Sequence, residues 1–325
     1  MSLDAILDRR LLIISGKGGV GKTTISAALG MMAARHGLRV LVAEVEGKNA
    51  ISHLLGVPPL TSEPREVRPG LWAMHVSPEE ALREYFEVQF HAKRVARPLV
   101  ASQLVYFVTH AAPGLRDILM LGKIWYQVAR KGEFDMALLD TPAAGHAVSM
   151  LRSPEGFLEA VQVGTLANQA KRVSDWLHDP EQVAIHLVSL AEETPVKETL
   201  ETARLMEERV HMHVDCVHMN MLYPPFAEDP ALNAALDRMK TPRGLRPRAK
   251  GTEVLSDDRA QALFACGEFY RDRRAMQQEH RGRLVEGLGG SASVVDLPFL
   301  FGDGFAGKEL DLLADVIEEQ ASATP

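Results

Sequence analysis

The chain has 325 residues, of which 46% are hydrophobic and 24% charged, the usage of an ordinary globular protein with a sizeable core. Its formal net charge of −7 and pI near 6.0 argue against general attraction to nucleic acid or to an anionic membrane surface. Two cysteines, Cys216 and Cys266, indicate a reducing compartment without a disulfide framework. The segment 1–10 carries acidic residues before any apolar run, so we do not expect it to be a signal peptide. A soluble cytoplasmic protein is therefore expected.

The first predicted strand, 11–14, leads into a glycine-rich loop and then a predicted helix over 25–34. The loop matches the phosphate-binding pattern G-x-x-x-x-G-K-[ST] in full, with the residues Gly16, Lys17, Gly18, Gly19, Val20, Gly21, Lys22, Thr23 and Thr24. In this context backbone N–H groups and the helix N-terminus face phosphate oxygens. We expect Lys22 to reach the β- and γ-phosphates of ATP and the Thr23 hydroxyl to ligate Mg²⁺.

The next segments alternate between strands and helices. Short apolar strands are predicted at 40–43, 134–140, 184–188, 214–219 and 293–297. Helices are predicted from a capping box at Ser77, over 196–208, and at the C-terminus. This alternation predicts an α/β fold with a mainly parallel sheet. Two segments interrupt it, a helical block at about 77–131 and a second at about 223–290. We interpret both as insertions that form a helical layer on a single domain spanning 1–325.

Asp140 ends its apolar strand, the position at which a carboxylate holds the Mg²⁺ shell. The segment from Asp140 to His146, D-T-P-A-A-G-H, resembles the switch II signature D-T-A-P-T-G-H-T of the arsenite-pump and tail-anchored-protein-targeting ATPases, the ArsA/Get family. Segments 188–199, 217–220 and 297–299 also resemble that family in order along the chain. The A-P-G-L-R-D segment at 112–117 resembles bacterial single-half homologues.

This resemblance implies a P-loop ATPase of the deviant Walker A type, built as a sandwich dimer. It implies that Lys17 crosses the dimer interface to the partner's phosphates, although Lys17 adding charge only to its own site is the alternative. It places Asn220 at the adenine ring and Pro298 in the loop that closes over the base. The expected partners are a second copy or a related ATPase subunit, with a hydrophobic client or a membrane protein, and no nucleic acid.

Switch I departs from the family pattern S-T-D-P-A-H. Counted from the strand, Glu46 takes the position of the aspartate that orients the attacking water, with Gly47 in place of proline. The longer side chain keeps the carboxylate but displaces it by about an ångström, which costs roughly 10²-fold in rate if it misplaces water. Two interpretations follow: a competent ATPase, with Lys17, Lys22, Glu46 and Asp140 as its catalytic set, or an impaired nucleotide-binding subunit that scaffolds an active relative. A surface-loop carboxylate is the third interpretation of Glu46.

Other features remain open or are disfavoured. The chain lacks the C-x-x-C zinc site of eukaryotic targeting factors and the cysteine triad of the arsenite pump. A ParA/MinD-like positioning ATPase is a further alternative, without a basic amphipathic C-terminal helix to support it.

One segment resembles a set of soft metal ligands, namely His211, His213, Cys216 and His218. These side chains converge only if the strand begins after His213, so a mixed core-and-edge strand is favoured. The basic stretch 238–250 is interpreted as a solvated loop, with an anion or partner contact as the alternative.

Overall fold

The fold was analysed in a computed structural model that describes residues 2–45, 49–90, 114–224, 230–231, 233–234, 257–301 and 307–323. Glu46 and Gly47 of switch I, the middle of the first insertion at 91–113 and the basic stretch 238–250 lie outside these residues.

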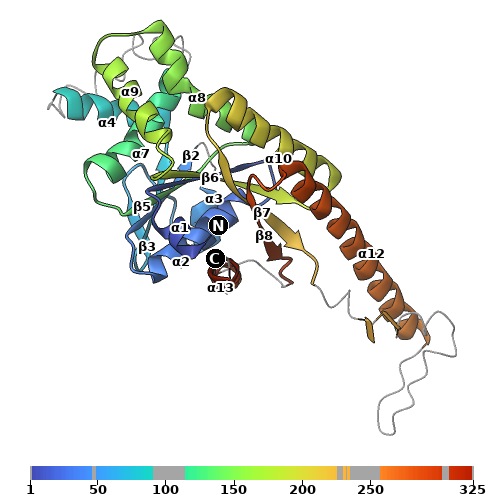
Figure 1. Cartoon of the computed structure of the whole chain (residues 1–325). Helices are drawn as coiled ribbons and strands as arrows, with labels where there is room; N and C mark the ends of the chain where they lie inside the picture. The colour runs from blue at the N-terminus through green and yellow to red at the C-terminus, as the bar shows by residue number, and fades with distance from the viewer. Residues whose placement is uncertain are drawn as a thin grey trace.

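An eight-stranded sheet forms the centre of the molecule (Figure 1). The strands are β1 Leu11–Gly16, β2 Val40–Val45, β3 Arg65–Arg68, β4 Leu71–Val76, β5 Met136–Asp140, β6 Val183–Leu190, β7 Val214–Leu222 and β8 Ser293–Pro298. Their order in the sheet is β3-β4-β2-β5-β1-β6-β7-β8. All neighbours pair in parallel except β3, which runs antiparallel to β4. The predicted α/β fold with a mainly parallel sheet is thus confirmed.

The strand sequences explain why the middle of the sheet is parallel. Every residue of β1, β2 and β5 is buried, as expected for unbroken apolar runs covered by helices on both faces. The strands β3 and β4 were not predicted. Arg65–Arg68 has only one buried residue and β4 alternates incompletely, so neither reads as a continuous apolar run.

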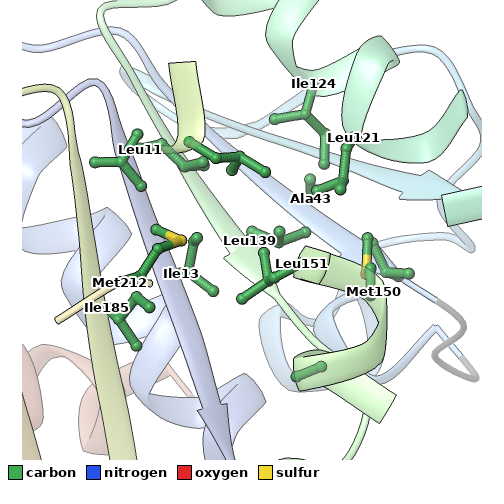
Figure 2. Close-up of a cluster of buried hydrophobic side chains, with 14 of the residues drawn as sticks. Leu11, Ile13, Ala43, Leu121, Ile124, Leu139, Met150, Leu151, Ile185 and Met212 are labelled. Atoms are coloured by element: carbon green, nitrogen blue, oxygen red, sulfur yellow. The ribbon is translucent and has the colours of Figure 1, made fainter. Parts of the chain in front are cut away.

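Two helical layers cover the sheet. On one face lie α1 Leu3–Leu7, α2 Lys22–Arg35, α3 Ala50–Leu55 and α13 Gly307–Ser322, packed on a core that includes Leu12, Ile14 and Val188. On the other face lie α7 Leu115–Trp125, α8 Ala144–Ala160, α9 Thr165–Leu177 and α10 Glu193–Leu205. Figure 2 shows the second core, where Leu121 and Ile124 of α7 and Leu151 of α8 face Leu139, Ile13 and Leu11 of the sheet.

The described parts of both insertions are helical. The first contains α4 Pro78–Phe90, α7 and the π-helical turn η1 Tyr126–Arg130. The second contains α12 Asp257–Leu288, a 32-residue helix that projects from the sheet as an arm (Figure 1). A second π-helical turn, η2 Met206–Val210, follows α10. Among the described helices, none has the length and apolar character needed to span a bilayer.

Candidate functional site

The glycine loop lies between the end of β1 and the start of α2, as the motif predicts. Gly16 has φ +149°, and a Cβ built on it would lie 2.3 Å from the Val188 carbonyl oxygen of β6. Gly21 has φ +97°, and a Cβ there would lie 2.5 Å from the Asn220 side-chain nitrogen. Both positions therefore require glycine for backbone conformation and for space. Gly18 and Gly19 are exposed, so their N–H groups lie at the open edge of the sheet.

Thr23 and Asp140 meet at the mouth of this loop. β1 and β5 are neighbours with Ile14 opposite Asp140, and this register places the end of β5 beside the loop. The Thr23 hydroxyl donates a hydrogen bond of 2.6 Å to Asp140 Oδ2. The other oxygen, Oδ1, is buried and has no hydrogen-bond partner among the described residues. The two residues that the sequence assigns to the metal are thus in direct contact.

The charges at this mouth are partly buried. Burial raises the pKa of Asp140 to about 6, against the opposing effects of the Thr23 hydrogen bond and the nearby Lys22. Burial also lowers the pKa of Lys22, whose ammonium group donates to the Lys17 carbonyl at 3.2 Å. A carboxylate with one oxygen that has no partner among the described residues, together with a partly desolvated ammonium group, suits a ligand that carries both a cation and anionic oxygens.

Glu44 is a second carboxylate that the sequence analysis did not single out. It lies opposite Asp140 in the register of β2 and β5 and is only 1% exposed. Oε1 accepts a hydrogen bond of 2.8 Å from the Ala50 N–H at the start of α3, while Oε2 has no partner among the described residues. Its negative charge contributes to the raised pKa of Asp140. A charged residue inside an otherwise apolar strand was the signal in the sequence that could have identified it.

Lys17 forms an ion pair within its own chain. Its ammonium nitrogen lies 2.7 Å from Glu198 Oε1 of α10, and both side chains are more than one-third exposed. Such an exposed pair contributes little to stability, so the lysine can leave it at low cost.

Asn220 and Pro298 lie at the same edge of the sheet. Asn220 is buried near the end of β7, and its amide nitrogen donates to the Val20 carbonyl of the loop at 2.9 Å. In this structure Asn220 therefore supports the loop, a contact that the resemblance did not imply. Pro298 ends β8, one strand further, opposite Leu222. Its neighbour Phe299 stacks on Tyr223 with 5.3 Å between ring centroids.

The oxygen donors at the mouth fit a hard divalent cation. The Thr23 hydroxyl and the Asp140 carboxylate, with one buried oxygen still unpartnered, are the ligand types that Mg²⁺ prefers, with phosphate oxygens and water completing its shell.

A cavity of about 760 Å³ lies in the helical layer, bordered by α4, α7, η1 and α9. Its lining combines aromatic side chains such as Trp125 and Tyr126 with charged ones such as Arg83 and Arg172. This mixed lining does not by itself favour a purely hydrophobic ligand. The buried Lys123, which contacts Glu84 Oε1 at 2.6 Å, forms part of its wall.

The histidine-rich segment folds differently from the four-residue cluster considered above. β7 begins at Val214, so His211 and His213 precede it, and His213 contacts the Ser291 carbonyl at 2.6 Å. Cys216 and His218 lie on the other side of that boundary, inside the core, and their neighbour is His186 of β6. The sequence analysis missed His186, which precedes Cys216 by 30 residues along the chain.

Comparisons with known proteins agree with the fold and the loop. Residues 9–163 match the family model described as anion-transporting ATPase. The chain is 34% identical over 268 residues to the ATPase BagA of Mycobacterium tuberculosis, covering 79% of this chain and 74% of that protein. It is 26% identical over 248 residues to an arsenical pump-driving ATPase of Acidiphilium multivorum, covering 69% of this chain and 42% of that protein. It is 27% identical over 234 residues to the ATPase ARSA1 of Chlamydomonas reinhardtii, covering 63% of this chain and 29% of that protein. The predicted resemblance is confirmed: the chain belongs to the ArsA-type family of P-loop ATPases.

Proposed function

We propose that this protein is a Mg²⁺- and ATP-dependent switch ATPase that works as a dimer in the cytoplasm. The observation that carries the proposal is the contact between the Thr23 hydroxyl and the Asp140 carboxylate at the mouth of a complete phosphate-binding loop. A hydroxyl and a carboxylate 2.6 Å apart, next to a lysine, form the minimal set that holds Mg²⁺ on the phosphates of a bound nucleotide.

The residues of the loop have distinct roles in this proposal. The N–H groups from Gly18 to Thr24 and the N-terminus of α2 bind the phosphate oxygens, and Lys22 contacts the β- and γ-phosphates. Thr23 and Asp140 would hold Mg²⁺, and the ion would supply positive charge that offsets the negative charge of the phosphates. Glu46, outside the described residues, orients the water that attacks the γ-phosphate. The Asn220 amide and Pro298 face the adenine ring, which requires Asn220 to exchange its contact with Val20 for one with the base.

Lys17 connects nucleotide binding to dimer closure. In the free chain it pairs with Glu198, and in the closed dimer we propose that it reaches the phosphates of the partner subunit. The stronger negative charge of a bound triphosphate favours this exchange because the pair with Glu198 is exposed and weak. The partner is a second copy or a related ATPase subunit, and closure changes the helical layer that handles a hydrophobic client or a membrane protein.

A second candidate function is a nucleotide-binding subunit that does not hydrolyse ATP and scaffolds an active relative. The specific observation in its favour is glutamate at position 46 where the family pattern has aspartate. A positioning ATPase of the ParA/MinD type remains the weaker alternative, because the last helix carries Asp311, Asp315, Glu318 and Glu319.

The deciding experiment measures ATP turnover and nucleotide binding of the purified chain side by side. We expect turnover that requires Mg²⁺ and is lost in Thr23→Ala and Asp140→Asn, whereas Thr194→Ala, at an exposed threonine outside the loop, should leave it unchanged. Tight ATP binding without turnover, restored by Glu46→Asp, would establish the scaffold instead. Absence of nucleotide binding in a folded chain would refute both functions.

Native mass measurement with and without ATP tests the dimer. We expect an ATP-dependent dimer in the wild type and its loss in Lys17→Ala. A Lys17→Ala chain that closes and hydrolyses ATP normally would show that Lys17 serves only its own subunit.

A further inference from the structure

Three potential metal ligands converge in the core between the neighbouring strands β6 and β7. They are His186 of β6 and Cys216 and His218 of β7, and their exposed fractions are 0%, 1% and 0%. One ring nitrogen of each histidine and the cysteine Sγ all lie within 4.8 Å of one another. Among the residues that the structure describes, we searched for groups of three or more histidine, cysteine or acidic side chains this close together, and these three form the group that was found.

The sheet register produces this convergence. His186 lies opposite Cys216, and Val188 lies opposite His218, in the parallel pair β6 and β7. Cys216 and His218 are two residues apart, so their side chains share one face of the strand. That face packs on the core beneath α2 and α13, which includes Ala184 and Val188 from β6. The two backbones therefore hold all three side chains in fixed positions.

The hydrogen bonds of the two imidazoles are incomplete. His186 Nδ1 and His218 Nε2 lie 3.0 Å apart, so one ring donates to the other. The remaining nitrogens, His186 Nε2 and His218 Nδ1, are buried and have no partner among the described residues. A buried polar atom without a partner is costly, and two in one cluster call for an explanation. Both rings are fully buried, which disfavours the charged form, and the neutral imidazole is the form that ligates a metal.

We propose that His186, Cys216 and His218 bind one soft monovalent metal ion, copper(I), as a three-coordinate site. Metal–nitrogen bonds of about 2.0 Å and metal–sulfur bonds of about 2.3 Å place donor atoms about 3.5 Å apart, a spacing within the range of this cluster. Imidazole and thiolate are the ligands that copper(I) and zinc share.

Charge balance selects the monovalent ion. Cys216 is a buried free thiol in the metal-free protein. Binding breaks its S–H bond and forms a metal–sulfur bond, and the proton leaves to solvent. One thiolate then neutralises one monovalent cation, whereas Zn²⁺ would leave an uncompensated positive charge in the core. An unpaired buried charge is strongly disfavoured.

The test uses the whole chain, produced with added copper, purified without oxygen or chelators, and separated from loosely bound metal by gel filtration. We expect one equivalent of copper per chain, a raised midpoint of thermal unfolding relative to the metal-free protein, and retention against a copper(I) chelator. The variant Cys216→Ala should lose the copper, while Cys266→Ala removes the exposed thiol and should keep it. His211→Gln and His213→Gln are the matched histidine controls, and both should also keep it.

A measurement on Cys266→Ala, which should keep its copper, tests the site even if the Cys216→Ala chain fails to fold. X-ray absorption at the copper edge should show one sulfur and two nitrogen neighbours. The proposal is overturned if the folded wild type retains no copper, if Cys216→Ala retains as much as the wild type, or if zinc is retained in preference to copper. These results do not depend on ATP turnover, so the metal site and the proposed function fail separately.

Discussion

Replacing Asp140 with asparagine should stabilise the metal-free protein while abolishing its activity. The Asp140 carboxyl is 4% exposed, and burial raises its pKa from 3.8 to about 6. Because the folded pKa exceeds the unfolded one, the stabilising contribution of this group is complete below pH 3.8 and is lost as the pH rises through about 6. The full loss amounts to about 3 kcal/mol in the free energy of unfolding.

Asparagine keeps the shape and still accepts the Thr23 hydrogen bond, but it carries no charge. The advantage of Asp140→Asn over the wild type should therefore grow from small at pH 4 to about 3 kcal/mol at pH 7 and stay constant above that. Denaturant unfolding without nucleotide or divalent metal, measured at several pH values, gives this difference directly.

Asp135→Asn provides a control of opposite sign. The hydrogen bond with Arg39 holds the pKa of Asp135 at about 2, so its contribution is present above pH 3.8 and lost as the pH falls through about 2. That variant should be less stable than the wild type at neutral pH. If Asp140→Asn shows a difference from the wild type that does not change with pH, the electrostatic reasoning about the site is refuted.

Three further predictions concern the loop, the dimer and the helical layer. Gly16→Ala should lower the free energy of unfolding by about 3 kcal/mol or more, because its Cβ would lie 2.3 Å from the Val188 carbonyl oxygen; an unchanged denaturation midpoint would contradict this. Glu198→Gln should change stability by less than about 1 kcal/mol but increase ATP-dependent dimer formation, measured by analytical ultracentrifugation, because it frees Lys17. Lys123→Met should lower the free energy of unfolding by about 2 kcal/mol, because it leaves the Ser62 carbonyl and the Glu84 carboxylate without their donor, and ATP turnover of the remaining folded protein should be unchanged.

The nucleotide-binding loop could be predicted because the residues that define it are consecutive in the sequence. The residues from Gly16 to Thr24 determine a backbone path by themselves, and the flanking apolar strand and helix follow in the sequence. Asp140 was predictable for the same reason, since it ends an apolar run whose burial makes the strand recognisable. The strands β3 and β4 were not, because the short, partly exposed Arg65–Arg68 gains its stability from pairing with β4 and not from a pattern of its own.

The features that were missed depend on register between distant strands. The sequence analysis assigned the switch I carboxylate to Glu46 and did not single out Glu44, because counting along one strand does not show which side chain faces the neighbouring strand. The structure places Glu44 opposite Asp140 and leaves one of its oxygens without a partner among the described residues. In the same way, a search limited to the segment 211–218 did not include His186, which joins Cys216 and His218 through the pairing of β6 with β7.

Glu44 has a specific role in the switch that we propose. One of its oxygens holds the N–H of Ala50 at the start of α3, and its charge opposes that of Asp140 on the adjacent strand. A cation held by Asp140 would offset this repulsion, since its positive charge would attract the Glu44 carboxylate. Metal binding at Asp140 of β5 would then affect the end of the switch I segment through Glu44. Glu44→Gln keeps the hydrogen bond to Ala50 and removes the charge, so it should weaken the dependence of ATP turnover on Mg²⁺ concentration while leaving nucleotide binding intact. A Mg²⁺ dependence identical to that of the wild type would show that Glu44 only caps α3.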